Sequence, residues 1–238
     1  MKNGGLKRMK LEAIVAEKNN FFKKVTLEWE QCVAIGYAGR DQESVKAHVE
    51  ELKAIGVPEP YSIPSMYWID PTIVSSAHEL SVIGEECSGE VEFFAAFDRN
   101  GDMFFTIASD HTDRKLETVS VSKAKQGCSK VIGEIFWKFS DVEDHWDEIL
   151  LRSWVKPAGE EERIYQDGKM AKLLPPSKLL ELARKDAPSK GEIAFLSGTI
   201  PLAGKICYTG DFIMELSDPM LGRSIKHRYS TTQLPDRN

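Results

Sequence analysis

The stretch that decides the fold is Ser88-Gly89-Glu90-Val91-Glu92-Phe93-Phe94-Ala95-Ala96-Phe97, an apolar and aromatic run with two carboxylates one residue apart. Because side chains of a strand alternate between its two faces, Glu90 and Glu92 are predicted to project from the same face. Like charges in an apolar setting repel each other and are costly to remove from water. The pair therefore predicts either a solvated sheet face or a site that holds a cation.

A strong turn signal follows this strand. Residues Asp98-Arg99-Asn100-Gly101-Asp102 contain Asn-Gly, which tolerates the positive φ angles of tight hairpin turns. Residues 102–109 are then predicted to form the return strand and to bring Asp110 near Glu90. A three-residue loop would place Asp110 opposite Glu90 on the same face, whereas a two-residue loop would place it on the other. A shared metal site requires the first register or a bulge.

Length and composition limit the possible functions. The chain has 238 residues, of which 42% are hydrophobic and 29% charged, and its formal net charge is -6. An acidic chain without clustered Lys and Arg is not expected to bind nucleic acid or a membrane surface, so a small-molecule or neutral partner is favoured. It has no apolar run of spanning length, and its four cysteines lack Cys-x-x-Cys spacing. A cytoplasmic protein with reduced thiols is expected.

Short strand-like segments separated by Gly, Asp and Pro residues predict one β-rich domain. Residues 1–10 are expected to be a disordered or tag-like leader and residues 231–238 a frayed tail. The single domain would cover residues 11–230, with a hairpin and a helix in residues 11–60. Strands are predicted at 11–16 and 25–35, which form the hairpin, and at 119–123, 191–196, 205–208, 212–216 and 223–229. Helices are predicted at 140–150 and 177–187.

The helix in the N-terminal part begins at Asp41, a plausible N-cap, and its apolar residues recur from Val45 until Gly56 stops the run. His48 lies at the edge of the apolar stripe, and Glu51 is its i,i+3 neighbour, so the two side chains can touch. The pair is either a partly buried histidine beside a solvated glutamate or a general base with its orienting carboxylate.

Five motifs in order resemble the fumarylacetoacetate hydrolase superfamily, and more closely an uncharacterised bacterial branch of it. They are Glu90-Val91-Glu92, then Ser109-Asp110-His111-Thr112-Asp113-Arg114, Ser122-Lys123, Gly198-Thr199-Ile200-Pro201 and Thr209-Gly210-Asp211. A His-x-x-Glu pair on a mobile helix, which smaller members carry, is matched by His48 and Glu51 after Tyr37. The resemblance spans about residues 33–229.

The resemblance implies a mixed β-sandwich or roll with a few peripheral helices, in an α+β, β-rich fold, and a homodimer. It implies that Glu90, Glu92 and Asp110 bind a metal, and an all-oxygen set of three carboxylates suits Mg²⁺ or Mn²⁺. His48 and Glu51 would form the general base on a lid helix, and Lys123 would add positive charge. Gly198, Thr199 and Tyr37 would contact the substrate.

The expected activity is metal-dependent hydrolysis of a carbon–carbon bond in an acylpyruvate-like diketo acid, through a metal-bound enolate. A dehydratase, decarboxylase or isomerase of a 2-oxo acid would use the same metal and enolate, and a non-catalytic binding protein is the third alternative. His111 is expected to be structural, because neighbours in a strand face opposite ways, and Asp113 is expected to pair with Arg114. Two features depart from the family pattern: Ile63-Pro64 stands in place of a Lys-Pro, and Ile200 is inserted in the Gly-Thr-Pro motif. These departures leave the identity of the substrate open.

Overall fold

The structure of the protein is a computed structural model that describes residues 8–19, 21–208 and 210–237. Its strands are β1 (Met9–Ala16), β2 (Phe22–Trp29), β3 (Gln31–Gly36), β4 (Ser65–Ile69), β5 (Val74–Ser75), β6 (Glu79–Ile83), β7 (Cys87–Ser88), β8 (Val91–Asp98), β9 (Met103–Ser109), β10 (Thr112–Asp113), β11 (Lys130–Ile132), β12 (Ile135–Lys138), β13 (Leu150–Lys156), β14 (Arg163–Lys169), β15 (Ile193–Leu196), β16 (Asp211–Asp218) and β17 (Arg223–Leu234). Its α-helices are α1 (Gln42–Ala54), α2 (Arg114–Glu117), α3 (Val121–Gln126) and α4 (Pro176–Asp186).

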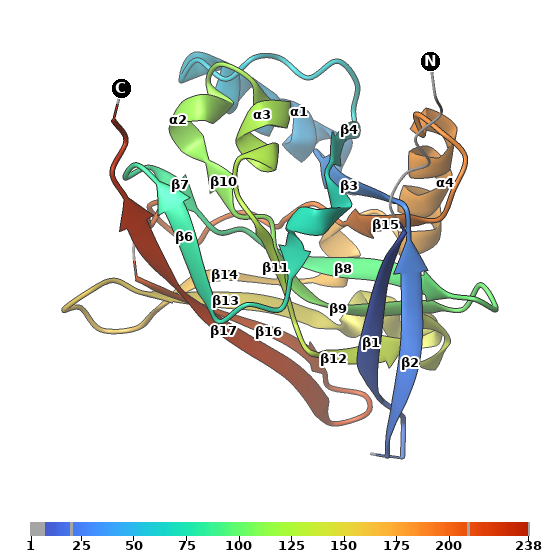
Figure 1. Ribbon diagram of the computed structural model, residues 1–238. Coiled ribbons are helices and arrows are strands. Elements are labelled where there is room, and N and C mark those ends of the chain that lie inside the picture. Colours follow the sequence, from blue (N-terminus) through green and yellow to red (C-terminus); the bar gives the residue numbers. More distant parts are fainter. Residues whose placement is uncertain (1–7, 20, 209, 238) are drawn as a thin grey trace.

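Within these residues the strands form two large sheets. The order of the larger is β4-β3-β15-β8-β2-β1-β12-β9-β11-β5, and an additional pairing between β8 and β9 closes β8, β2, β1, β12 and β9 into a ring. The second sheet has the order β14-β13-β16-β17-β6. Figure 1 shows it along one side of the molecule, with α1, α2 and α3 gathered at one end and α4 beside β15. This is the α+β, β-rich fold with peripheral helices that the sequence predicts.

The hairpin of β8 and β9 lies at the centre because both of its faces are apolar. Phe93 and Phe105 face the second sheet and pack edge to face on Trp146, with ring centroids 5.1 and 5.0 Å apart. Phe94 and Phe104 face the interior of the ring. A strand buried on both faces supplies a rigid base, so a charged side chain at its end is held in a defined place.

Several predicted boundaries differ from the structure. The predicted strand over 25–35 is divided at Glu30, because β2 pairs with β1 whereas β3 pairs with β15 and β4. Residues 119–123 are not a strand: Ser120 caps α3, and its Oγ accepts a hydrogen bond from the amide of Lys123. Residues 139–148 form 3-10 turns in place of the predicted helix, although Trp146 is buried as expected.

The ends of the chain also differ from the prediction. Residues 1–7 of the predicted leader lie outside the described residues, but Met9 and Lys10 already belong to β1. In the predicted tail, residues 231–234 continue β17 and pair with β6 through Leu234 and Ile83. None of the helices in the described ranges is long and apolar enough to span a membrane.

Candidate metal centre

The turn between β8 and β9 has the loop length that a shared site requires. Asp98 and Asp102 close the turn through an amide-to-carbonyl hydrogen bond of 3.1 Å, and Gly101 adopts a φ of 82°. The register is therefore Val91 opposite Ser109, and the Asp110 amide donates to the Glu90 carbonyl at 3.0 Å. The predicted juxtaposition of Asp110 and Glu90 is confirmed.

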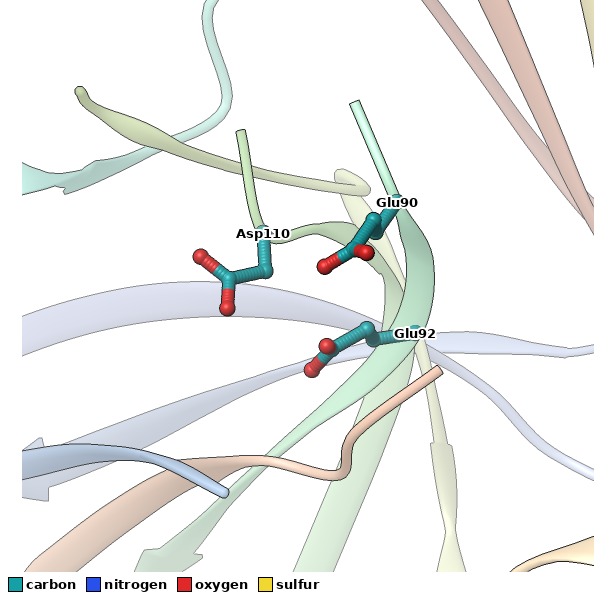
Figure 2. Close-up of side chains that lie close together, drawn as sticks. All are labelled: Glu90, Glu92 and Asp110. Carbon is teal, nitrogen blue, oxygen red and sulfur yellow. The ribbon is translucent and has the colours of Figure 1, made fainter. Parts of the chain in front are cut away.

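Three carboxylates meet where this hairpin ends. Glu90, Glu92 and Asp110 each offer an oxygen, and these oxygens lie within 4.8 Å of one another. Figure 2 shows the side chains of Glu90, just before β8, and Glu92, in β8, projecting to the same side, with that of Asp110 beside them. Glu92 and Asp110 are each only 1% exposed, and Glu90 is half-buried. Such burial rules out the solvated sheet face as the explanation of the charge pattern.

The protein itself holds at least one oxygen of each carboxylate. These contacts are the Gly198 amide on Glu92 Oε2 at 2.9 Å, Arg114 Nη2 on Glu90 Oε1 at 3.3 Å and Lys130 Nζ on Asp110 Oδ1 at 2.8 Å. The other oxygens, Glu92 Oε1, Glu90 Oε2 and Asp110 Oδ2, belong to side chains whose orientation is fixed in this way. Hydrogen bonds and ion pairs from neighbouring protein groups orient metal ligands in this way.

Two lysines contact Asp110, and Lys123 is not one of them. Lys130 is fully buried and also donates to the His111 carbonyl at 2.6 Å, while Lys125 donates to Asp110 Oδ2 and lies 4.0 Å from Glu90 Oε2. Lys123 is exposed. Residues two apart on a helix face different directions, so Lys123 and Lys125 of α3 cannot both face the carboxylates. The structure thus replaces Lys123 by Lys125 and Lys130 as the cationic side chains of the centre.

The electrostatics of the cluster favour a cation. Burial and the charge of Asp110 raise the pKa of Glu92 well above its usual value. Burial also opposes ionisation of Asp110, but the ammonium groups of Lys125 and Lys130 overcome it and lower the pKa of Asp110. Glu92 is therefore a buried carboxylate with too little positive charge around it. A hard divalent ion beside Glu92 would supply that charge, and three carboxylate oxygens are ligands that Mg²⁺ and Mn²⁺ accept.

The histidine pair forms, but at the surface. His48 Nδ1 lies 3.6 Å from Glu51 Oε2 on α1, and the two side chains are 59% and 77% exposed. The His48 ring lies 6.3 Å, between centroids, from the ring of Tyr37. Tyr37 is half-buried with a φ of 58°, and it is close enough to Glu90 and Lys125 for their charges to act on its pKa, which burial raises. Tyr37 is thus near the histidine pair and within the electrostatic influence of the carboxylate cluster.

Gly198 and Thr199 support the centre through hydrogen bonds to Glu92 and to the backbone of β8. The Gly198 amide holds Glu92, and the Thr199 hydroxyl donates to the Val91 carbonyl at 2.7 Å and accepts from Gln166 at 2.7 Å. Both residues therefore fix β8 in the structure. Thr209 of the later predicted motif lies outside the described residues.

Gly198 cannot be replaced without a local change. Its φ is 81°, and a Cβ would lie 2.7 Å from the Ile35 carbonyl oxygen. Gly198→Ala should lower the stability by about 1–3 kcal/mol and, by displacing the amide on Glu92, weaken metal binding by roughly tenfold. Thermal unfolding and calorimetric titration with Mg²⁺ measure the two effects. Gly204→Ala is the matched control, because its Cβ would meet no atom within 4 Å; equal behaviour of the two variants would contradict the assignment.

The remaining polar residues of the motif have structural contacts. His111 is buried against Tyr229, whose hydroxyl lies 2.9 Å from Nδ1, and burial together with Lys130 lowers the pKa of His111 to about 3. Asp113 caps α2 by accepting from the Leu116 amide, and it does not pair with Arg114 in the described residues. Arg114 instead contacts Glu90, which is remote in sequence, and Glu117, its i,i+3 neighbour.

Comparison with known proteins gives a family and a fold. The family described as "Protein of unknown function (DUF2848)" matches residues 35–229. No curated protein sequence matches the chain. Among solved structures, a 2-keto-3-deoxyarabinonate dehydratase is similar with a TM-score of 0.61 and 15% identity, covering 87% of this chain and 75% of its own. Cg1458, crystallised with an inhibitor, is similar with a TM-score of 0.63 and 17% identity, covering 95% and 90%.

A further similar structure is a 2-keto-3-deoxy-D-arabinonate dehydratase complexed with magnesium and 2,5-dioxopentanoate, with a TM-score of 0.59, 16% identity and coverage of 87% and 74%. At this identity the likeness concerns the fold, and these neighbours belong to the fumarylacetoacetate hydrolase superfamily. The family match shows that the chain belongs to the DUF2848 family, and its fold is similar to that of these fumarylacetoacetate hydrolase-type neighbours.

Proposed function

We propose that the protein is a divalent-metal-dependent enzyme that acts on a small 2-oxo acid through an enolate. The observation that carries the proposal is the buried cluster of Glu90, Glu92 and Asp110, in which the protein holds and orients at least one oxygen of each carboxylate. Mg²⁺ is the preferred ion, since a dehydratase of similar fold is complexed with magnesium, and Mn²⁺ suits the same ligands.

The formal charges around the cluster favour an anionic substrate. Four carboxylates, those of Glu90, Glu92, Asp110 and Glu117, face three cationic side chains, those of Arg114, Lys125 and Lys130. A divalent ion would leave the centre positive, and the carboxylate of a 2-oxo acid would restore the balance. When bound, the ion would act as a Lewis acid that stabilises the enolate oxygen. Arg114 and Lys125 would add positive charge near the developing negative charge, and Tyr37 would contact the substrate at its outer end.

The hydrolytic form of the reaction uses His48 and Glu51. Cleavage of an acylpyruvate-like diketo acid needs a base that activates water, and the imidazole oriented by Glu51 is suited to this task. The pair lies on α1 beyond Tyr37 and is exposed. The hydrolytic form therefore requires α1 to bring His48 to the bound substrate. Gly198 holds Glu92 in place, and Thr199 holds the neighbouring backbone of β8.

A dehydratase is the second candidate, and the exposure of the His48 pair favours it. Elimination of water from a 2-oxo acid needs the enolate but no attacking water. The groups that stabilise an enolate are all assembled in the buried cluster, whereas the water-activating pair is not. Two of the similar structures are dehydratases, one of them complexed with 2,5-dioxopentanoate.

His48→Ala separates the two candidates. If the enzyme is a hydrolase, the variant should lose about 100-fold or more in kcat with metal affinity unchanged, because general base catalysis is worth that much and His48 contacts no metal ligand. If it is a dehydratase, kcat should change little. His78→Ala is the matched control, since His78 is similarly exposed at 63%. Full hydrolytic activity in the His48 variant would refute the assignment of the base.

The proposal as a whole is tested by a substrate screen. Acylpyruvates and 3-deoxy-2-oxo sugar acids are incubated with the protein and Mg²⁺ or Mn²⁺, and products are identified by mass spectrometry before and after removal of metal by a chelator. Turnover of a 2-oxo acid that depends on the metal would support the proposal. Binding without turnover across the panel would point to a binding protein. The homodimer that the resemblance implies is a separate proposal, tested by light scattering.

A further inference from the structure

Lys125 occupies a distinctive position among the three carboxylates. Its ammonium donates to Asp110 Oδ2 and lies 4.0 Å from Glu90 Oε2. These are the two oxygens that Lys130 and Arg114 leave free, because Lys130 holds Asp110 Oδ1 and Arg114 holds Glu90 Oε1. The ammonium of Lys125 therefore faces the same carboxylate oxygens that a metal ion would need.

Lys125 and Lys130 differ in how firmly they are held. Lys130 is completely buried, and it bonds both to Asp110 Oδ1 and to the backbone carbonyl of His111. Lys125 comes from the short helix α3, and the partners that the described residues provide for its ammonium are the carboxylates and, at 5.7 Å, the face of the Tyr67 ring. Lys130 is thus part of the framework. Lys125 has a flexible four-carbon side chain and no backbone acceptor to fix its head group.

A metal ion bound to Asp110 Oδ2 would lie close to the Lys125 ammonium. Two like charges a few ångströms apart in a buried site repel each other by several kcal/mol at an effective dielectric constant of about 20. The ammonium therefore opposes binding of a divalent ion at Asp110 Oδ2, and movement of Lys125 away from this oxygen would relieve the repulsion.

We propose that Lys125 is a built-in counter-ion that competes with the divalent ion for the free oxygens of Asp110 and Glu90. The inference rests on the proposed metal site. Lys125 neutralises the carboxylates while no metal is bound, which keeps the hairpin ends together, and it lowers the affinity for the metal. Lys125 is accordingly a positioning residue that sets metal affinity, in addition to its charge near the substrate.

The test is calorimetric titration of the metal-free protein with Mn²⁺ and with Mg²⁺. Lys125→Met keeps the length of the side chain and removes its charge, so the metal affinity should rise by about ten- to a hundredfold, the range that loss of a competing charge-assisted hydrogen bond implies. The matched control is Lys123→Met, two residues earlier on the same helix with an exposed side chain. It should bind with the affinity of the wild type.

Thermal unfolding gives a second readout. Without metal, Lys125→Met should unfold at a lower temperature than the wild type, because the carboxylates lose a counter-ion, and saturating Mn²⁺ should raise its Tm more than that of the wild type. If Lys125→Met does not fold, Lys125→Gln carries the same test. An unchanged or weaker metal affinity in the neutral variant would overturn the proposal, since a lysine that merely orients the ligands would weaken binding when it is removed.

Failure of this inference can be told from failure of the metal site itself. If the site is right and the competition is not, Glu92→Gln weakens metal binding in an otherwise wild-type chain while Lys125→Met fails to strengthen it. If the site is wrong, the wild type and Glu92→Gln bind the metal equally or not at all. Absence of binding in the wild type together with absence of binding in Lys125→Met overturns both.

Discussion

Replacing Glu92 with glutamine should reduce metal affinity by at least about 100-fold and abolish metal-dependent turnover. Mutating the groups that orient metal ligands already lowers metal affinity ten- to a hundredfold, and this substitution removes one of the proposed ligands. The amide has almost the shape of the carboxylate, and its oxygen can still accept the hydrogen bond from the Gly198 amide. The variant should therefore fold, and because Glu92 is buried and short of positive charge, its metal-free stability should be equal to that of the wild type or higher.

The measurements are calorimetric titration with Mg²⁺ or Mn²⁺, turnover of the best 2-oxo acid and thermal unfolding. Glu181→Gln is the control, because Glu181 lies on the exposed side of α4 and pairs with Lys178 away from the cluster. Activity and metal affinity of Glu92→Gln within threefold of this control would refute the metal centre.

Replacing Lys130 with methionine should have the largest effect on stability. Lys130 is 0% exposed and is the framework partner of Asp110, so its loss weakens a buried ion pair and leaves the His111 carbonyl without that donor. Removal of one partner from a buried pair costs about 3–5 kcal/mol. For a chain of this length that corresponds to a fall in Tm of roughly 10 °C.

The control for this variant is Lys138→Met. Lys138 makes the same kind of bond to Asp102, at 2.6 Å, but the two side chains are 31% and 44% exposed. Exposed pairs contribute at most about 1 kcal/mol, so the Tm of this control should fall by no more than a few degrees. A similar fall in both variants, measured by calorimetry at one pH and salt concentration, would show that Lys130 is not the framework residue proposed here.

The parts of the site that lie on one hairpin could be predicted from the sequence. Alternation along a strand placed Glu90 and Glu92 on one face, and the Asn100-Gly101 turn limited Asp110 to two positions. Both rules are local, and the hairpin is a local structure. The general fold class followed in the same way from short strands separated by turn residues.

The partners of the carboxylates could not be predicted, because they come from remote or misread segments. Gly198 reaches Glu92 across 106 residues of sequence. Residues 119–123 alternate valine with serine and so imitate a strand, but Ser120 caps a helix and Val119 is 73% exposed. The choice of Lys123 rests instead on the Ser122-Lys123 dipeptide of the family resemblance. The sequence also holds a second Ser-Lys dipeptide at Ser129-Lys130, which would have pointed to the buried lysine.

The carboxylate hairpin and helix α1 differ in how much a substitution in each would lower the stability of the protein. The carboxylates stand on a hairpin with both faces in the core, whereas α1 buries only Val45 and Val49 among its 13 residues. Exposed substitutions on α1 change stability little, while changes in β8 or β9 threaten the whole fold. Evolution could therefore vary the residues of α1 and keep intact the hairpin that carries the proposed metal site. This division of labour would let one scaffold give rise to hydrolases and dehydratases by changing a single surface helix.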